Sequence, residues 1–274
     1  MLKKYGFVRV GAIVNEIHLA DVGYNVSKIK ELITEAYEKG IEIAVFPELS
    51  LCGYTIQDMV LTDDLLNNVL KGLCELKEFS KKYKIVFIVG APLKINNSLY
   101  NCAFSFCGGH IIGITPKTYI PNYNEFYECR YYSKANNLKT NKINLFGEDV
   151  LISNKLIYKC DNFDLAYAID ICEDLWMVNA PSNTTSLNGA NIIFNLSGSN
   201  EIAGKMKYRK NLVMMQAQKT LSAYVYASCG VWESTSDILF SGHSIITEPC
   251  GDTTENERFR SEEHTSELQS RSDL

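Results

Sequence analysis

The stretch AIDICEDLW, residues 168–176, begins with a largely apolar run that ends at Cys172. Two acidic residues, Glu173 and Asp174, follow directly. A short apolar run is typical of a buried strand, and Glu173-Asp174 is typical of the first turn of a helix. The pattern predicts a thiol at a strand-to-helix turn, where backbone N–H groups and the helix N-terminus would stabilise a thiolate and an oxyanion. The alternative is a buried structural cysteine. We expect that structural role for Cys74, Cys102, Cys107, Cys160 and Cys229.

Similar apolar, β-branched runs recur along the chain and alternate with helical patterns. The predicted strands are 7–14, 43–46, 85–89, 163–169, 192–196 and 224–227. Helices are predicted at 26–39, where Gly40 supplies a C-terminal stop, and at 205–220. Residues 99–106 and 111–115, with Gly108-Gly109 between them, predict an antiparallel hairpin. Strands that alternate with helices and include a hairpin predict an α/β fold with mixed sheets.

Length and composition indicate one domain that acts on a small molecule. A chain of 274 residues with 46% hydrophobic content can bury one large core. The net charge of −5 and scattered basic residues argue against nucleic acid or a membrane as partner. No secretory signal and no run of about 20 apolar residues appears, so we expect a cytoplasmic protein. The nine cysteines are dispersed without zinc-like spacing, so we expect reduced thiols and no metal.

The last fifteen residues, RSEEHTSELQSRSDL from Arg260, lose all hydrophobic periodicity. We expect the domain to span 5–259 and residues 260–274 to lie outside the fold. This string resembles the conceptual translation of a sequencing-library adapter, which would make it a non-native tail. The alternative is an ordinary disordered tail. If the tail is non-native, the natural protein continues past Phe259.

A cysteine nucleophile needs a base, and the histidines are poor candidates for it. His18 and His110 lie in turn-like contexts, His264 lies in the tail, and His243 is expected to be structural. Glu48, in VFPELSLCGY, follows a strongly apolar predicted strand. Partial burial there would raise the pKa of a carboxyl toward that of a working base. The alternative is a solvated loop glutamate.

A third segment, PKTYIPNYNEFYECRYYS at 116–133, follows a predicted strand and is dense in aromatic and polar residues. Its lysine, Lys117, would meet the oxyanion of a tetrahedral intermediate, and its charge would favour a thiolate. The alternative is a surface lysine beside an aromatic ligand-binding loop.

The three segments together resemble the nitrilase, or carbon–nitrogen hydrolase, superfamily. This resemblance implies a four-layer α-β-β-α sandwich and a Glu-Lys-Cys triad in that order along the chain. By the same resemblance Glu48 is the general base, Lys117 the oxyanion lysine and Cys172 the nucleophile. Glu125 resembles the second glutamate, which positions the lysine and the substrate.

Within the superfamily, residues 119–133 and residues 6–29 are similar to the glutaminase domain of glutamine-dependent NAD synthetases. The resemblance implies L-glutamine as substrate and a thioester on the cysteine. It implies that Tyr123, Ser199 and Lys205 bind the substrate. Residues 197–200 read Ser-Gly-Ser-Asn, whereas the family often places a proline near this serine. We therefore expect a different local backbone there.

The resemblance also implies a partner domain that is missing from this chain. The synthetase half of such enzymes uses ATP and magnesium and carries a Ser-Gly-Gly-type pyrophosphate loop, which does not occur here. The glutaminase half needs no cofactor, and the full-length protein is expected to form a homo-oligomer. Two alternatives remain: a stand-alone nitrilase-type amidase for another small amide, and a catalytically silent scaffold domain.

Overall fold

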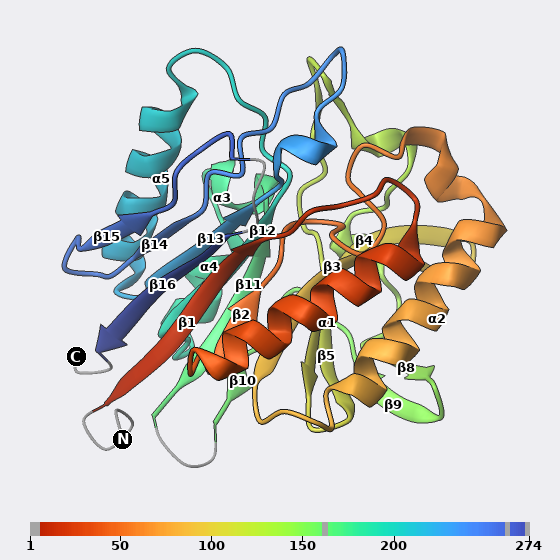
Figure 1. The fold of residues 1–274 in the computed structure, drawn as a ribbon, viewed down its shortest axis with the longest axis horizontal. Helices are drawn as coiled ribbons and strands as arrows, with labels where there is room; N and C mark the ends of the chain where they lie inside the picture. Colours follow the sequence, from red (N-terminus) through yellow and green to blue (C-terminus); the bar gives the residue numbers. More distant parts are fainter. Residues whose placement is uncertain (1–5, 161–163, 261–263, 272–274) are drawn as a thin grey trace.

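Two six-stranded sheets face each other in the computed structural model, which describes residues 6–160, 164–260 and 264–271 (Figure 1). The first sheet contains, in order across it, β16 (His264–Arg271), β1 (Phe7–Val14), β2 (Ile43–Val45), β3 (Val86–Ile95), β4 (Ser98–Cys107) and β5 (His110–Pro116). The second contains β10 (Tyr158–Lys159), β11 (Ala166–Ile171), β12 (Ile192–Ser197), β13 (Ala223–Ser228), β14 (Ile245–Thr247) and β15 (Thr253–Glu255). Two small hairpins lie outside them: β6 (Asn122–Tyr123) with β7 (Phe126–Tyr127), and β8 (Lys142–Leu145) with β9 (Glu148–Leu151).

Both sheets are mixed, as predicted. In the first, β1, β2 and β3 are parallel, and β4 and β5 continue antiparallel. In the second, β11, β12 and β13 are parallel, with antiparallel strands on both sides. The parallel strands are covered on both faces, which explains why they read as continuous apolar runs rather than alternating ones.

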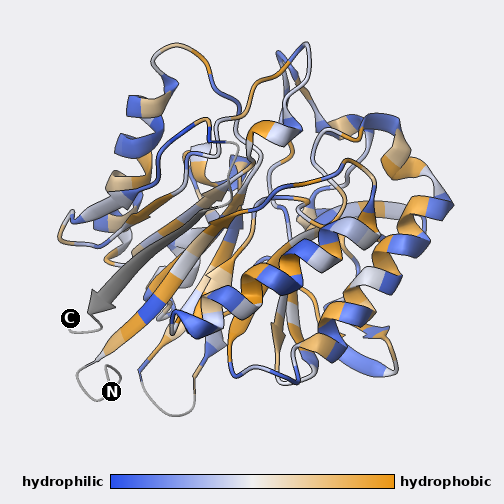
Figure 2. Ribbon diagram, viewed as in Figure 1, coloured by the Kyte–Doolittle hydropathy of each residue, from blue (hydrophilic) through white to orange (hydrophobic). Residues whose placement is uncertain are grey.

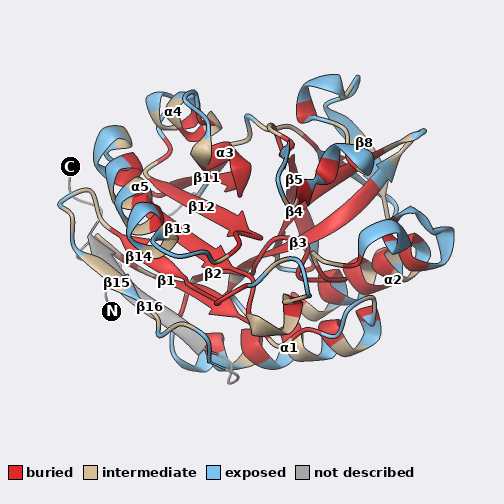
Figure 3. Ribbon diagram, turned by 90° about the horizontal axis from the view of Figure 1, so that it is seen from above, coloured by how far each residue is buried: buried red, intermediate tan, exposed pale blue. Residues whose placement is uncertain are grey.

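The inner faces of the sheets form one core (Figure 3). Val10 and Val45 from the first sheet pack with Ile169 and Phe194 from the second, and all four side chains are buried. This packing fixes the two sheets relative to each other and so fixes the strand ends that carry the site.

Helices cover the outer faces and complete the four layers (Figure 1). The first sheet is covered by α1 (Val22–Glu38) and α2 (Asp63–Phe79), and the second by α3 (Glu173–Trp176), α4 (Pro181–Leu187) and α5 (Lys205–Thr220). Short 3-10 helices are η2 (Gln57–Leu61), η3 (Glu128–Arg130), η4 (Ala135–Asn137) and η5 (Val231–Glu233). The predicted α-β-β-α sandwich is therefore confirmed.

The two helices on the first sheet, α1 and α2, each pack one apolar face against it (Figure 2). In α1 the Asp21 carboxylate accepts a hydrogen bond from Tyr24 N at 3.0 Å, so the helix starts earlier than predicted. Helix α2 was not among the predicted elements, although its buried residues repeat at helical spacing. These residues are Leu65, Leu66, Val69, Leu73 and Leu76. None of the described helices is long and apolar enough to cross a membrane.

Residues 264–271, expected to lie outside the domain, form β16 antiparallel to β1. The hydrogen bonds between these two strands are made by backbone groups, which any extended sequence supplies. The polar sequence of residues 264–271 therefore does not predict the pairing. The origin of residues 260–274 stays a prediction. Tyr5 and Phe163, the first residues of the predicted domain and of one predicted strand, lie outside the described residues.

Candidate active site

The candidate catalytic residues follow the ends of strands from both sheets. Glu48 comes after β2, Lys117 directly after β5, and Cys172 directly after β11. The carboxyl ends of these strands lie at one edge of the sandwich, the usual place for a site in such folds. Side chains far apart in the sequence therefore meet in one buried cluster.

Glu48 is completely buried, so the alternative of a solvated loop glutamate is wrong. Its Oε1 accepts from Lys117 Nζ at 2.6 Å and from Asn101 Nδ2 at 2.7 Å. Its Oε2 accepts from the backbone N–H of Gly198 at 2.7 Å. Donors from both sheets thus fix the orientation of this carboxylate.

Lys117 is also completely buried, and the alternative of a surface lysine is wrong. Besides Glu48, its ammonium donates to both oxygens of Glu128, at 2.8 and 2.9 Å. Burial alone would lower the pKa of Lys117, but the carboxylates of Glu128 and Glu48 hold it well above its usual value. The lysine is a fixed cation.

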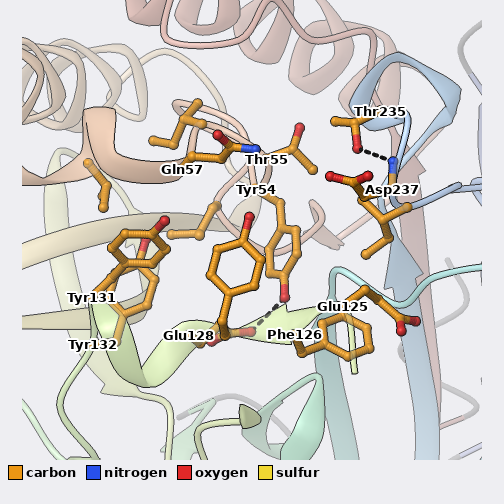
Figure 4. A pocket seen from close by; sticks show the side chains of 15 residues that line it. Tyr54, Thr55, Gln57, Glu125, Phe126, Glu128, Tyr131, Tyr132, Thr235 and Asp237 are labelled. Atoms are coloured by element: carbon orange, nitrogen blue, oxygen red, sulfur yellow. Dashed lines mark hydrogen bonds between the residues drawn. The ribbon is translucent and has the colours of Figure 1, made fainter. Parts of the chain in front are cut away.

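The second glutamate on Lys117 is Glu128, and the assignment of that contact to Glu125 is corrected. Figure 4 shows Glu128 beside Tyr54, whose hydroxyl donates to Glu128 Oε1 at 2.7 Å, while Glu125 lies apart from both. Glu125 instead accepts a hydrogen bond from the Asn200 side chain. Glu125 lies in the turn of the β6–β7 hairpin, whereas Glu128 begins η3. Strands of two residues leave no periodic pattern, so spacing alone could not decide which glutamate turns toward the lysine.

Cys172 has a strained backbone, with φ of 43° and ψ of −95° in a residue that carries a side chain. Its N–H donates to Leu196 O at 2.9 Å and to Asn195 Oδ1 at 3.2 Å, and these bonds hold the turn. The turn places Cys172 in the wall of a cavity of about 500 Å³. The predicted strand-to-helix turn is therefore present, with α3 beginning at the next residue.

The surroundings of Cys172 favour the thiol over the thiolate. Burial raises the pKa of Cys172, the nearby carboxylate of Glu48 raises it further, and Lys117 only partly opposes them. The resting group is therefore a protonated thiol at neutral pH. Such a nucleophile needs a base to remove its proton when substrate arrives.

The cavity beside Cys172 contains all three residues predicted to bind substrate. Tyr123 donates from its hydroxyl to Glu173 Oε2 at 2.8 Å. Ser199 Oγ is buried without a hydrogen-bond partner in the structure, although it lies near Tyr226. Lys205 donates to Asn200 Oδ1, and its ammonium lies 5.0 Å from the centre of the Trp176 ring.

His243 is structural, as expected. It is buried between Arg209, 3.0 Å from its Nδ1, and Glu255, 2.9 Å from its Nε2. Burial lowers the pKa of His243. Among residues 6–160 and 164–260, no cluster of three or more His, Cys, Asp or Glu side chains could hold a metal ion.

Residues 9–268 match the family model for carbon-nitrogen hydrolases. The chain belongs to the carbon-nitrogen hydrolase family. That match includes strands of both sheets and every residue of the cluster described above.

Relatives of this carbon-nitrogen hydrolase include longer enzymes. It is 35% identical over 257 residues to the glutamine-dependent NAD(+) synthetase of Mycobacterium tuberculosis, covering 93% of this chain and 38% of the relative. The enzyme of the same name from Aquifex aeolicus is 29% identical over 85% of this chain and 37% of its own. This chain thus spans about two fifths of the length of these curated relatives.

Solved structures show the same fold. A glutamine-dependent NAD(+) synthetase from Cytophaga hutchinsonii aligns with a TM-score of 0.86 at 23% identity, covering 96% of this chain and 43% of its own. An amidase from Nesterenkonia sp. aligns with a TM-score of 0.77 at 13% identity, covering 97% of this chain and 91% of its own.

Several residues at the site of this carbon-nitrogen hydrolase were not predicted from the sequence. The contacts above add Tyr54, Asn101, Glu128, Glu173 and Asn200. Glu173 was detectable, because it follows the predicted nucleophile directly. Asn101 was not, because it lies inside an apolar strand where an amide gives no catalytic signal.

Proposed function

We propose that this chain releases ammonia from L-glutamine, as the glutaminase part of a glutamine-dependent NAD synthetase. The observation that carries the proposal is the buried cluster of Glu48, Lys117 and Glu128 beside Cys172, which lies in the wall of a cavity lined by groups of both charges. The relatives' names support the substrate. The cluster supports amide hydrolysis.

The first half of the reaction makes a thioester. Glu48 takes the proton of the Cys172 thiol as sulfur attacks the carbonyl carbon of the substrate amide. The carbonyl oxygen becomes an oxyanion, which Lys117 and a backbone N–H stabilise. The carbon–nitrogen bond then breaks, the proton passes from Glu48 to the leaving nitrogen, and ammonia departs.

The second half of the reaction hydrolyses the thioester and regenerates the free enzyme. Glu48 removes a proton from water, which attacks the thioester carbonyl and passes through a second oxyanion held by Lys117. The carbon–sulfur bond breaks, the sulfur regains a proton, and glutamate leaves. The strained turn at Cys172 keeps the sulfur at the cavity wall in both halves.

The cavity suits an α-amino acid. Lys205 supplies a positive charge for an α-carboxylate, and Glu125 and Glu173 supply negative charges for an α-ammonium. Ser199 Oγ, buried and without a partner, would gain a hydrogen bond from bound substrate. Tyr123, bonded to Glu173, would contact the same end of the molecule.

The parent protein would add a synthetase domain. That domain would bind ATP and magnesium and use the released ammonia to amidate nicotinic acid adenine dinucleotide to NAD. We further propose a homo-oligomeric parent that acts in the cytoplasm. The names and greater length of the relatives support the synthetase domain.

The substrate proposal is tested with Lys205→Met. Loss of this cation should raise KM for glutamine about tenfold or more, while turnover of acetamide and propionamide, which lack the amino acid end, should not change. Ammonia release is measured for each amide with both proteins. An equal effect on all amides would contradict glutamine as the substrate and indicate another small amide. Faster hydrolysis of propionamide than of glutamine by the wild type would do the same.

A further inference from the structure

Asp174 lies two residues after Cys172 and is buried, yet it belongs to neither the charged cluster nor the cavity lining described above. Its Oδ1 accepts from the backbone N–H groups of Thr118 at 3.1 Å and Tyr119 at 2.9 Å. Its Oδ2 accepts from the backbone N–H of Ile171 at 3.0 Å. One carboxylate therefore holds the residue before Cys172 and the two residues after Lys117.

These two segments come from different sheets. Lys117 follows β5 of the first sheet, and Cys172 follows β11 of the second. Facing sheets are about 10 Å apart and are held mainly by apolar side chains, which set the distance between two strand ends only loosely. Three directional hydrogen bonds to one rigid carboxylate set it more tightly.

We infer that Asp174 is a positioning residue that fixes the Lys117 ammonium relative to the Cys172 sulfur for reactions that form an oxyanion. This inference rests on the proposed role of Lys117 as the oxyanion-binding cation. A displacement of about 1 Å between reacting groups can slow a reaction about 100-fold. The three hydrogen bonds that Asp174 accepts, here called the Asp174 clamp, therefore affect the rate of oxyanion-forming reactions although Asp174 does not contact substrate.

The same turn supplies a matched control. Asp170 is buried as deeply as Asp174, but it accepts from Ser182 N at 3.0 Å and from the Tyr224 hydroxyl at 3.0 Å. Those partners belong to α4 and β13, not to the Lys117 segment. Burial raises the pKa of Asp174 and the charge of Asp170 raises it further, so Asp170→Asn removes that repulsion but leaves the three hydrogen bonds that Asp174 accepts in place.

The experiment compares two reactions of Cys172 in the whole chain. Acylation by p-nitrophenyl acetate passes through an oxyanion, whereas alkylation by 2-iodoethanol displaces iodide and forms none. Both rates are followed by mass spectrometry of the peptide that carries Cys172, with Cys172→Ala as background. In Asp174→Asn one acceptor oxygen is lost, so acylation should fall about 10- to 100-fold while alkylation stays within about twofold.

A purely structural role for Asp174 would lower both rates together, and that result would overturn the inference. An equal loss of acylation in Asp170→Asn would overturn it as well. If the wild type releases no ammonia from glutamine but Asp174→Asn still loses acylation selectively, the proposed substrate fails and the positioning role stands.

A second measurement applies if Asp174→Asn does not fold. Hydrogen exchange on the wild type should show the amides of Thr118 and Tyr119 protected, because Asp174 holds both. If these two amides exchanged as fast as the amide of exposed Asn124, the inference that Asp174 holds this segment would be wrong.

Discussion

Two buried carboxylates share one ammonium beside Cys172, and this imbalance of charge shapes the chemistry. Lys117 neutralises Glu48 or Glu128 but not both, so the surplus negative charge adds to burial in raising the pKa of the Cys172 thiol. A protonated resting thiol resists oxidation and unwanted alkylation. The carbonyl of a bound amide, placed beside Lys117, then provides the acceptor that makes attack favourable.

Glu128→Gln should separate its role from that of Glu125. Removing the Glu128 charge weakens the hold on Lys117, so kcat should fall about 100-fold. Because Glu128 raises the pKa of the Cys172 thiol, its neutral replacement should shift the pH dependence of Cys172 alkylation to lower pH. Steady-state kinetics and alkylation rates measured against pH check both effects.

Glu125→Gln is the matched control for that substitution. Its carboxylate bonds Asn200 at the cavity, so the variant should raise KM for glutamine and leave kcat within about threefold. A larger loss of kcat in Glu125→Gln than in Glu128→Gln would contradict the assignment of the lysine contact.

The strand β3 places Glu48 through a close backbone approach. A Cβ on Gly90 would lie 2.8 Å from the carbonyl oxygen of Pro47 and would also collide with Leu49 N. Gly90→Ala should therefore displace Glu48, lower stability by about 1–3 kcal/mol and reduce amide hydrolysis at least tenfold. Urea unfolding and ammonia release measure the two losses.

Gly23, in α1, provides the contrast. A Cβ there meets only Asp21 Oδ1 at 3.7 Å, an ordinary contact. Gly23→Ala should leave activity unchanged and leave stability unchanged or raised by about 0.5 kcal/mol. A Gly90→Ala variant as active and stable as Gly23→Ala would show that this approach does not position Glu48.

Sequence patterns predicted the elements well where burial produces periodicity. The strands 7–14, 192–196 and 224–227 and the helix 205–220 lie within a residue of their predicted bounds. Predicting the site was harder, because Glu48, Lys117 and Cys172 each have an ordinary structural interpretation when taken alone. Only their combination indicates a catalytic site. The choice of Glu128 over Glu125 depends on the β6–β7 hairpin, which places Glu125 in its turn, and strands of two residues give no periodic signal.

Across the whole molecule, the first sheet ends at β16, whose backbone pairs with the full length of β1. A chain shortened to residue 260 would expose the edge of β1, and exposed edges promote association. Such a chain should melt at lower temperature and self-associate, as followed by thermal unfolding and analytical ultracentrifugation. A chain shortened to residue 271 is the control. A shortened chain that remains monomeric with an unchanged Tm would show that β16 adds nothing to the fold.

The proposed function requires that Cys172 attack the side-chain carbonyl of glutamine. A diazo-ketone analogue of glutamine, incubated with the purified chain and with Cys172→Ala, tests it by intact mass. We expect one covalent adduct on the wild type, located on Cys172, and none on a folded Cys172→Ala variant. An adduct on both proteins, or none on a folded wild type, would contradict it.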